Sequence, residues 1–184
     1  MHDSRERFGA VALPFMRNVY GAALRMCGSR DVAEDVTQET YLRAYRTFDG
    51  FQAGTNCKAW LLTIMRSVLI NRFHHAQRHP EAALDAMSPD ADVFATTDAR
   101  ITAIVDQAPT PEVEAALAAL PDEYRAAVVL VDIEELSYEE ASHVLQCPVG
   151  TVRSRLSRAR RLLFTALQEH ARGAGYAVEP ERRS

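Results

Sequence analysis

The chain has 184 residues, of which 47% are hydrophobic and 25% charged, with 8 glycines and 8 prolines. Since one domain typically uses about 150 residues, this length fits one large or two small domains and excludes an enzyme of many modules. The composition is typical of a soluble globular protein with a substantial core. A formal net charge of −4 argues against a protein that coats nucleic acid through overall positive charge, so any basic surface must be local.

Neither export nor membrane insertion is indicated. No apolar run approaches the roughly 20 residues of a membrane-spanning helix, and the N-terminal residues MHDSRERF mix acidic and basic side chains, unlike a secretory signal. The cysteines Cys27, Cys57 and Cys147 are far apart and include no C-x-x-C pair, which predicts reduced thiols rather than disulfides or a zinc site. We therefore expect a cytoplasmic protein without a membrane span.

The first part of the chain predicts helices. Apolar residues recur every three or four positions over residues 8–26, the period of an amphipathic helix. Pro14 interrupts this pattern, so it either kinks the helix or begins a second one. Ser29 or Asp31 can cap the next helix, which is expected to run to about residue 48.

That second helical segment has two different faces. Its apolar row repeats at a step of four and consists of Val32, Val36, Thr40, Ala44 and Phe48. Its opposite, largely polar side consists of Asp35, Gln38, Glu39, Leu42 and Arg46. Because Leu42 is an apolar residue on a polar face, it indicates a binding partner.

The charge changes sign along the next part of the chain. A further helix is expected over residues 59–77, and between Gly50 and Pro80 the sequence contains basic residues but no acidic one. Residues 80–111 are instead rich in acidic residues and proline, which predicts an acidic, flexible and mostly extended linker.

A helix-turn-helix is predicted in the last part of the chain, where helical patterns return at residue 112. Residues 137–140 have the S-x-x-E spacing of a capping box, and Pro148 ends the helix over residues 138–146 and begins the next one. The exposed side of that next helix carries Arg153, Ser154, Ser157, Arg158 and Arg161.

The second helix of such a motif enters the major groove of DNA, where an arginine can bond O6 and N7 of guanine together. A solvated basic face on an ordinary bundle helix is the alternative interpretation. The segment between Gly150 and Gln168 has no acidic residue that could pair with its arginines one turn away. We therefore favour DNA binding.

No catalytic or metal-binding pattern emerges. Nearby arginines suggest that His74, His75 and His79 extend a phosphate-facing surface rather than hold a metal. The carboxylate pairs at 134–135 and 139–140 occupy adjacent helix positions and point apart. We expect no enzyme, no cofactor and no metal.

Four stretches carry a family resemblance. In chain order they are EDVTQETYLRAYRTFDGF, KAWLLTIMRSVLINRF, ALPDEYRAAVVL and PVGTVRSRLSRARRLL. They resemble the extracytoplasmic-function branch of bacterial sigma-70-type initiation factors, over about residues 8–79 and 112–170. Two further stretches, LPFMRNVYGAALRM and FQAGTNCKAWLL, look closest to the oxidative-stress subgroup, which is regulated by zinc-containing anti-sigma proteins.

The resemblance implies an all-α protein with two small helical domains joined by the acidic linker. Residues 1–79 would be sigma region 2, residues 80–111 the linker, residues 112–172 region 4 with the helix-turn-helix, and residues 173–184 a disordered tail. Such a protein binds the beta-prime clamp and beta subunit of core RNA polymerase and directs initiation at specific promoters. A stress-response regulon, an anti-sigma partner and a protein that forms no homo-oligomer are also implied.

The resemblance also implies three sets of site residues. The clamp set comprises Asp35, Gln38, Glu39, Leu42 and Arg46. The minus-10 set, for DNA melting and reading, comprises Asn56, Cys57, Lys58, Trp60, Arg66, Asn71 and Arg72. The minus-35 set comprises Thr151, Arg153, Ser154, Arg155, Ser157, Arg158 and Arg161. Of the minus-35 set, Thr151, Arg155 and Arg161 would contact phosphates; the apolar side on which Trp60 falls favours a core position over a base contact.

Two other functions remain as alternatives. A sigma-like decoy would sequester an anti-sigma protein without touching DNA, but such decoys tend to lose the basic recognition surface that this chain retains. A polymerase-independent helix-turn-helix regulator would bind its operator as a dimer.

Overall fold

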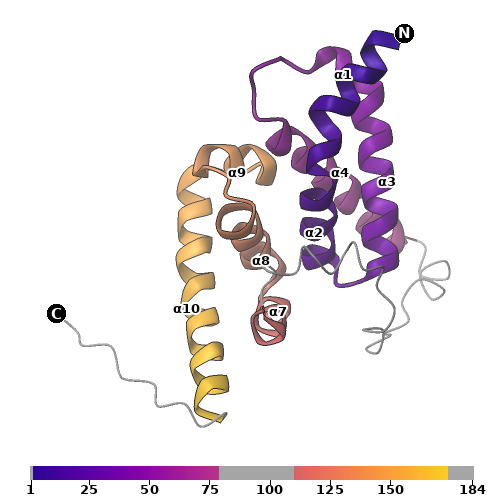
Figure 1. Ribbon diagram of the computed structural model, residues 1–184. Coiled ribbons are helices and arrows are strands. Elements are labelled where there is room, and N and C mark those ends of the chain that lie inside the picture. Colours follow the sequence, from indigo (N-terminus) through magenta and orange to yellow (C-terminus); the bar gives the residue numbers. More distant parts are fainter. Residues whose placement is uncertain (1, 79–109, 174–184) are drawn as a thin grey trace.

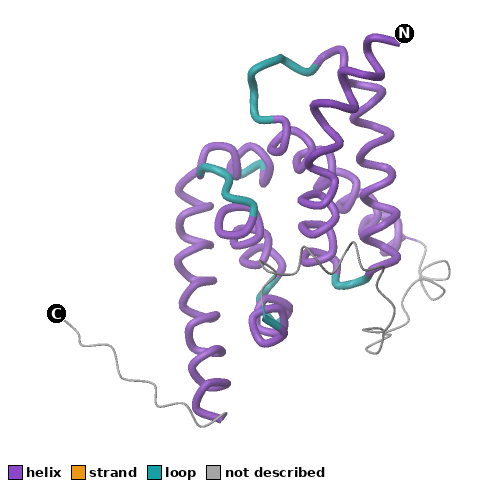
Figure 2. The backbone as a smooth tube through the Cα atoms, viewed as in Figure 1, coloured by secondary structure: helices purple, strands orange, loops and turns teal. Residues whose placement is uncertain are grey.

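The computed structural model describes residues 2–78 and 110–173, and all regular secondary structure in these two ranges is helical (Figures 1 and 2). The all-α prediction is therefore confirmed for this part of the chain. The predicted linker, apart from residues 110 and 111, and residues 174–184 of the predicted tail lie outside the described residues. None of the described helices is both long enough and apolar enough to cross a membrane.

The first half of the protein, residues 2–78, is a helical bundle. Its elements are α1 (His2–Ala12), η1 (Leu13–Phe15), α2 (Met16–Cys27), α3 (Arg30–Thr47), η2 (Phe48–Gly50) and α4 (Cys57–Arg78). Pro14 lies in the short 3-10 turn η1 that separates α1 from α2, which confirms the predicted interruption. Gly28 ends α2 with φ 72°, and the hydroxyl of Ser29 caps α3 by accepting from the Val32 amide at 3.4 Å.

The core of the first half forms where α2, α3 and α4 meet. The predicted apolar row of α3 faces inward, with Val36, Thr40 and Ala44 fully buried, and the core that it joins includes Leu61 and Met65 of α4. Thr40 does not leave an unpaired hydroxyl there, because its Oγ1 donates to the Val36 carbonyl at 2.6 Å. An aromatic cluster of Phe8, Tyr41, Tyr45, Phe48, Phe51 and Trp60 joins α1, α3 and the start of α4.

The second half, residues 110–173, contains the helix-turn-helix. Its elements are α7 (Pro111–Ala118), α8 (Asp122–Val128), the π-helical turn η4 (Val129–Ile133), α9 (Tyr138–Leu145) and α10 (Val149–Gly173). Ser137 and Glu140 form the predicted capping box at the start of α9. The turn to α10 passes through Gln146 in the left-handed conformation, with φ 51°, directly before Cys147 and Pro148.

The two halves lie side by side and touch each other (Figure 1). Helix α2 lies against α7, α8 and η4, while α4 lies against α9. The long helix α10 is on the side of the second half that faces away from the first half. This direct contact is a feature that the sequence did not predict, and it determines which candidate site residues are accessible.

Candidate functional site

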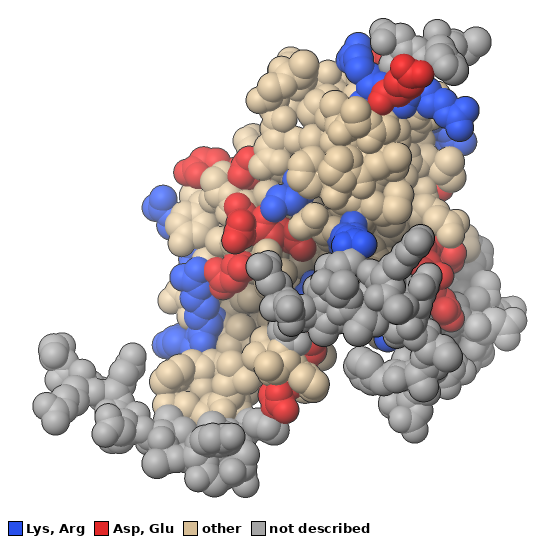
Figure 3. Space-filling view, in the orientation of Figure 1, with Lys and Arg blue, Asp and Glu red and all other residues tan. Residues whose placement is uncertain are grey.

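One side of α10 forms an open basic face. Val152, Leu156 and Ala159 are buried against the rest of the second half, and the opposite side of the helix faces solvent. The exposed members of the minus-35 set are Arg153, Ser154, Ser157, Arg158 and Arg161. Basic side chains gather along this helix in the space-filling view (Figure 3). These residues present guanidinium and hydroxyl groups on the side of the helix that residues 2–78 and 110–173 leave exposed.

Some side chains of this face are held in place by neighbours. The Arg153 guanidinium lies 5.5 Å from the centre of the Tyr138 ring, a cation–π arrangement that ties α10 to α9. The Ser154 hydroxyl donates to the Thr151 carbonyl at 3.0 Å. Such contacts limit the conformations that these side chains must lose when they bind a ligand.

Arg155 differs from the other arginines of the minus-35 set because it is engaged inside the second half. Its guanidinium forms an ion pair with Glu123 of α8 at 2.8 Å, and a further nitrogen lies 3.7 Å from the sulfur of Cys147. The Arg155 side chain is only 24% exposed. This arrangement joins α10 to α8 and to the turn of the motif, which is a positioning role.

The clamp set lies along the outer side of α3. Asp35, Gln38, Leu42 and Arg46 are exposed, and Leu42 is 53% exposed although it is apolar. Between α3 and α4 an open groove of about 430 Å³ is lined by the clamp-set residues Asp35, Gln38, Glu39 and Leu42, together with others including Asn71 and Arg72. An exposed leucine beside a polar groove suits a partner that buries it.

Two residues of the predicted minus-10 set belong to this same groove. Asn71 and Arg72 are exposed near the end of α4, and Arg72 donates to the Asp35 carboxylate at 3.0 Å. Asn71 and Arg72 therefore lie beside the clamp set, near the end of α4, whereas Asn56 and Trp60 lie at its start.

The other end of α4 faces the second half. The Asn56 amide donates to Glu140 of α9 at 2.7 Å, and the Lys58 ammonium donates to the backbone carbonyl of Glu134. Asn56, Trp60 and Glu140 also line an open groove of about 340 Å³ between α4 and α9. These minus-10 residues are thus already in contact with protein.

Arg66, Cys57 and Trp60 are each partly or wholly withdrawn from solvent. Burial lowers the pKa of Arg66, whose guanidinium is within electrostatic reach of Arg155 and Cys147 in the second half. Cys57 is 7% exposed, and burial raises the pKa of its thiol, so it stays protonated as a core residue. Trp60 packs with its ring centre 4.9 Å from that of Phe51, yet it also lines the groove.

Glu134 is a buried acid that the sequence analysis did not select. It is 3% exposed, and burial raises the pKa of its carboxyl, although a hydrogen bond from Asn18 lowers it again in part. The Asn18 amide donates to it at 2.8 Å from α2, across the contact between the halves. The available signal was an acidic residue inside the apolar stretch VVLVDIEEL.

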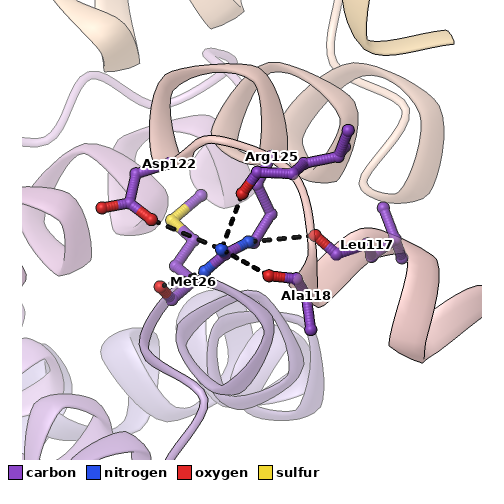
Figure 4. Close-up of polar contacts among 6 residues, drawn as sticks. Met26, Leu117, Ala118, Asp122 and Arg125 are labelled. Carbon is purple, nitrogen blue, oxygen red and sulfur yellow. Dashed lines mark hydrogen bonds and ion pairs between the residues drawn. The ribbon is translucent and has the colours of Figure 1, made fainter. Parts of the chain in front are cut away.

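Arg125 of α8 is a second residue that the sequence analysis missed. Its side chain, 14% exposed, donates to the carbonyls of Leu117 and Ala118 at the end of α7 (Figure 4). It also donates to the carbonyl of Leu120, two residues beyond that helix. It also reaches the Met26 carbonyl at the end of α2, at 3.4 Å. A cation at the C-terminal ends of α7 and α2 offers donors to carbonyls where the regular helical hydrogen bonds run out.

Comparison with known proteins agrees with this organisation. A model of sigma-70 region 2 matches residues 13–79, and a model of sigma-70 region 4 matches residues 111–163. The two matches define the class, a sigma-70-type protein with a region 2 and a region 4.

Relatives narrow that class to one family. The chain is 38% identical over 154 residues to the ECF RNA polymerase sigma factor SigE of Mycolicibacterium smegmatis, covering 83% of this chain and 58% of that protein. It is 36% identical over 157 residues to the ECF RNA polymerase sigma factor EcfG of Rhodopseudomonas palustris, covering 85% and 81%. The chain therefore belongs to the extracytoplasmic-function family of RNA polymerase sigma factors.

A solved structure has a similar fold. It is the sigma factor RpoE in complex with the anti-sigma factor NepR from Bartonella quintana, which aligns with a TM-score of 0.69 and 26% identity, covering 91% of this chain and 98% of that one.

Proposed function

We propose that this sigma factor divides its work between three surfaces. The clamp set on α3 binds core RNA polymerase, the first half melts and reads the minus-10 element, and the basic face of α10 reads the minus-35 element as duplex. The observation that carries the proposal is the uncovered face of Arg153, Ser154, Ser157 and Arg158 on the second helix of a helix-turn-helix.

The two DNA-reading surfaces depend on polymerase. The chain has a net charge of −4, so its overall field does not attract DNA, and each surface offers only a few cations. When core enzyme holds both surfaces on one promoter, the second contact becomes intramolecular and its effective concentration rises. Free protein is therefore expected to bind promoter DNA weakly.

We further propose regulation by an anti-sigma protein in the cytoplasm and a stress-response regulon. Support comes from the structural neighbour, which is bound to an anti-sigma factor, and from similarity to the oxidative-stress subgroup. That similarity extends the proposal to a zinc-containing partner. Co-purification from the native host, followed by metal analysis of the complex, tests both parts.

Run-off transcription with purified core polymerase tests the central proposal. Transcription starts mapped after overexpression in the host supply the template. We expect core enzyme plus the chain to initiate at these promoters and Arg158→Ala to lower initiation by about 10-fold to 100-fold, since a bidentate guanine contact discriminates by about 1–3 kcal/mol. Core binding, measured by sedimentation, should not change.

Arg161→Ala is the matched control, because it removes a predicted phosphate contact from the same helix. It should weaken all promoters alike, whereas Arg158→Ala should also relax the sequence preference. Equal loss of core binding in Arg158→Ala would contradict the division of labour. A protein that never stimulates initiation would support the decoy, and a dimer that binds DNA without polymerase would support the independent regulator.

A further inference from the structure

We propose that Tyr138 is a positioning residue for the reading of the minus-35 element. Its ring holds the Arg153 guanidinium in place without using the hydrogen-bond donors that a base needs. This inference rests on the proposed function, since it takes Arg153 as a base-reading residue. It adds a residue of α9 to the determinants of promoter choice, whereas the minus-35 set lies on α10 alone.

Two other arginines of α10 are held in place by carboxylates. Arg155 forms an ion pair with Glu123 of α8 at 2.8 Å. Arg160 donates to both carboxylate oxygens of Asp132 in η4, at 3.1 and 2.5 Å. A carboxylate fixes an arginine by accepting from its N–H groups, so these groups are no longer free for a DNA base. This way of fixing a side chain therefore competes with base reading.

Arg153 is held instead by an aromatic ring. Its guanidinium carbon lies over the Tyr138 ring, 5.5 Å from the ring centre. Within residues 2–78 and 110–173, the Arg153 guanidinium forms no ion pair and donates no hydrogen bond. A guanidinium meets a ring through its flat face and donates hydrogen bonds in its own plane. The ring can therefore hold Arg153 while its N–H groups stay available for O6 and N7 of guanine.

The ring that holds Arg153 is itself fixed. Tyr138 is the first residue of α9 and directly follows Ser137, whose capping box with Glu140 fixes the backbone at this point. The Tyr138 side chain is half-buried and packs against the hydrophobic core. A side chain that is anchored in this way can restrict an exposed neighbour without becoming disordered itself.

Holding Arg153 before DNA arrives lowers the cost of binding. A long side chain loses rotamer freedom when it bonds a guanine, and this loss opposes binding. The ring already favours one conformation of the exposed Arg153 in the free protein. At an exposed site, a cation–π contact favours that conformation by about 2-fold to 5-fold. We expect loss of the ring to weaken base reading by about the same factor, because fewer molecules then have the guanidinium in place.

A substitution of Tyr138 tests this role in the full chain with core polymerase. Tyr138→Met removes the ring and keeps a flexible apolar side chain. Run-off transcription at limiting concentrations of the chain uses templates that each carry one changed minus-35 base pair. Arg153→Ala first identifies the base pair that Arg153 reads, as the one where preference is lost. We expect Tyr138→Met to lower initiation, and the preference at that base pair alone, by about 2-fold to 5-fold.

Two control variants separate the ring from other parts of the tyrosine. The hydrogen bonds to Asp132 raise the pKa of Arg160, and the Tyr138 hydroxyl adds to this rise. Tyr138→Phe removes only the hydroxyl, so it should match the native chain. Tyr124→Met removes the ring of another half-buried tyrosine in the second half and is the matched control. It should leave the preference at the Arg153 base pair unchanged.

A double variant separates positioning from a merely structural role. Arg153→Ala combined with Tyr138→Met should initiate at the same rate as Arg153→Ala alone, because the ring acts only through the guanidinium. A further loss in the double variant would show that Tyr138 acts through the fold and would overturn the inference. Circular dichroism checks folding, and Tyr138→Leu provides a second substitution without a ring.

The outcomes distinguish the inference from the proposed function. If Arg153→Ala loses a base preference and Tyr138→Met keeps it, only the positioning role is overturned. An equal loss in Tyr138→Phe and Tyr138→Met would assign the effect to the hydroxyl and would also overturn that role. If Arg158→Ala changes a base preference and Arg153→Ala changes none, the inference fails while α10 still reads DNA. If neither variant changes a preference, the proposed reading of the minus-35 element fails as well.

Discussion

The two halves of this sigma factor present their candidate DNA-binding residues in opposite ways. On α10, Arg153 and Arg158 are exposed, and their helix lies away from the first half. At the start of α4, Lys58 and the preceding Asn56 already donate hydrogen bonds to the second half. The residue types that match the family's motifs therefore indicate what a surface can bind. The packing of elements that are distant in sequence decides whether that surface is accessible.

Removing the Arg125 guanidinium should abolish the difference between the two halves, because it would disrupt the second half and its contact with α2. Arg125→Met removes the side-chain donors that reach the carbonyls of Leu117, Ala118 and Leu120. We expect the free energy of unfolding to fall by about 2–4 kcal/mol, measured by urea denaturation. Arg158→Met, at an exposed arginine of the same half, should change it by less than about 0.5 kcal/mol. Equal effects of the two substitutions would show that Arg125 does not stabilise the second half.

A substitution at Leu42 should show that the first half also has an open surface. Leu42→Asp puts a charge on the 53% exposed position of the clamp set. We expect about 10-fold weaker binding to core polymerase, because a desolvated carboxylate at such an interface is unpaired. Folding stability should not change. Native affinity for core polymerase in this variant would remove α3 from the proposed clamp interface.

The smallest predicted effect concerns the buried acid at the contact. The pKa of Glu134 is raised in the folded protein, so its ionised form is disfavoured by folding and stability is lost as pH rises through this raised pKa. Glu134→Gln keeps an oxygen for the Asn18 amide but has no charge. The variant should therefore melt at a higher temperature than the native chain at pH 7 and at the same temperature near pH 4.

Thermal melts of both proteins between pH 4 and pH 8 measure this difference. A difference that is independent of pH would show that the substitution acts through packing. A lower melting temperature for Glu134→Gln at pH 7 would show that the ionised carboxylate stabilises the contact, contrary to the prediction.

The fold could be predicted well where the signals are local. Pro14 interrupts the first helix, Ser29 caps α3, and Ser137 with Glu140 begins α9, because each acts on backbone groups within a few residues. The π-helical turn η4 had no comparable signal. The contact between the halves could not be predicted, since it joins residues such as Arg25 and Glu114 that are far apart in sequence.

In the candidate site, too, local features could be predicted from the sequence and contacts between distant residues could not. Arg153, Arg155 and Arg158 are the same residue type, although helical periodicity places Arg155 nearer than the other two to the apolar side of α10. The ion pair with Glu123, on another helix, separates Arg155 from the other two, which are exposed. In the same way, the sequence indicated that Lys58 is a cation for DNA and gave no sign of the Glu134 carbonyl that holds it.

One carboxylate serves two purposes. One Glu140 oxygen accepts from the Ser137 amide and hydroxyl at the start of α9, and the other accepts from Asn56 across the contact. A mutation that removed Glu140 would therefore weaken the contact between the halves and also the start of α9, the latter at a cost of about 0.5–2 kcal/mol. A substitution at Arg25 or Glu114 would weaken the contact and leave the capping box of the helix-turn-helix unchanged.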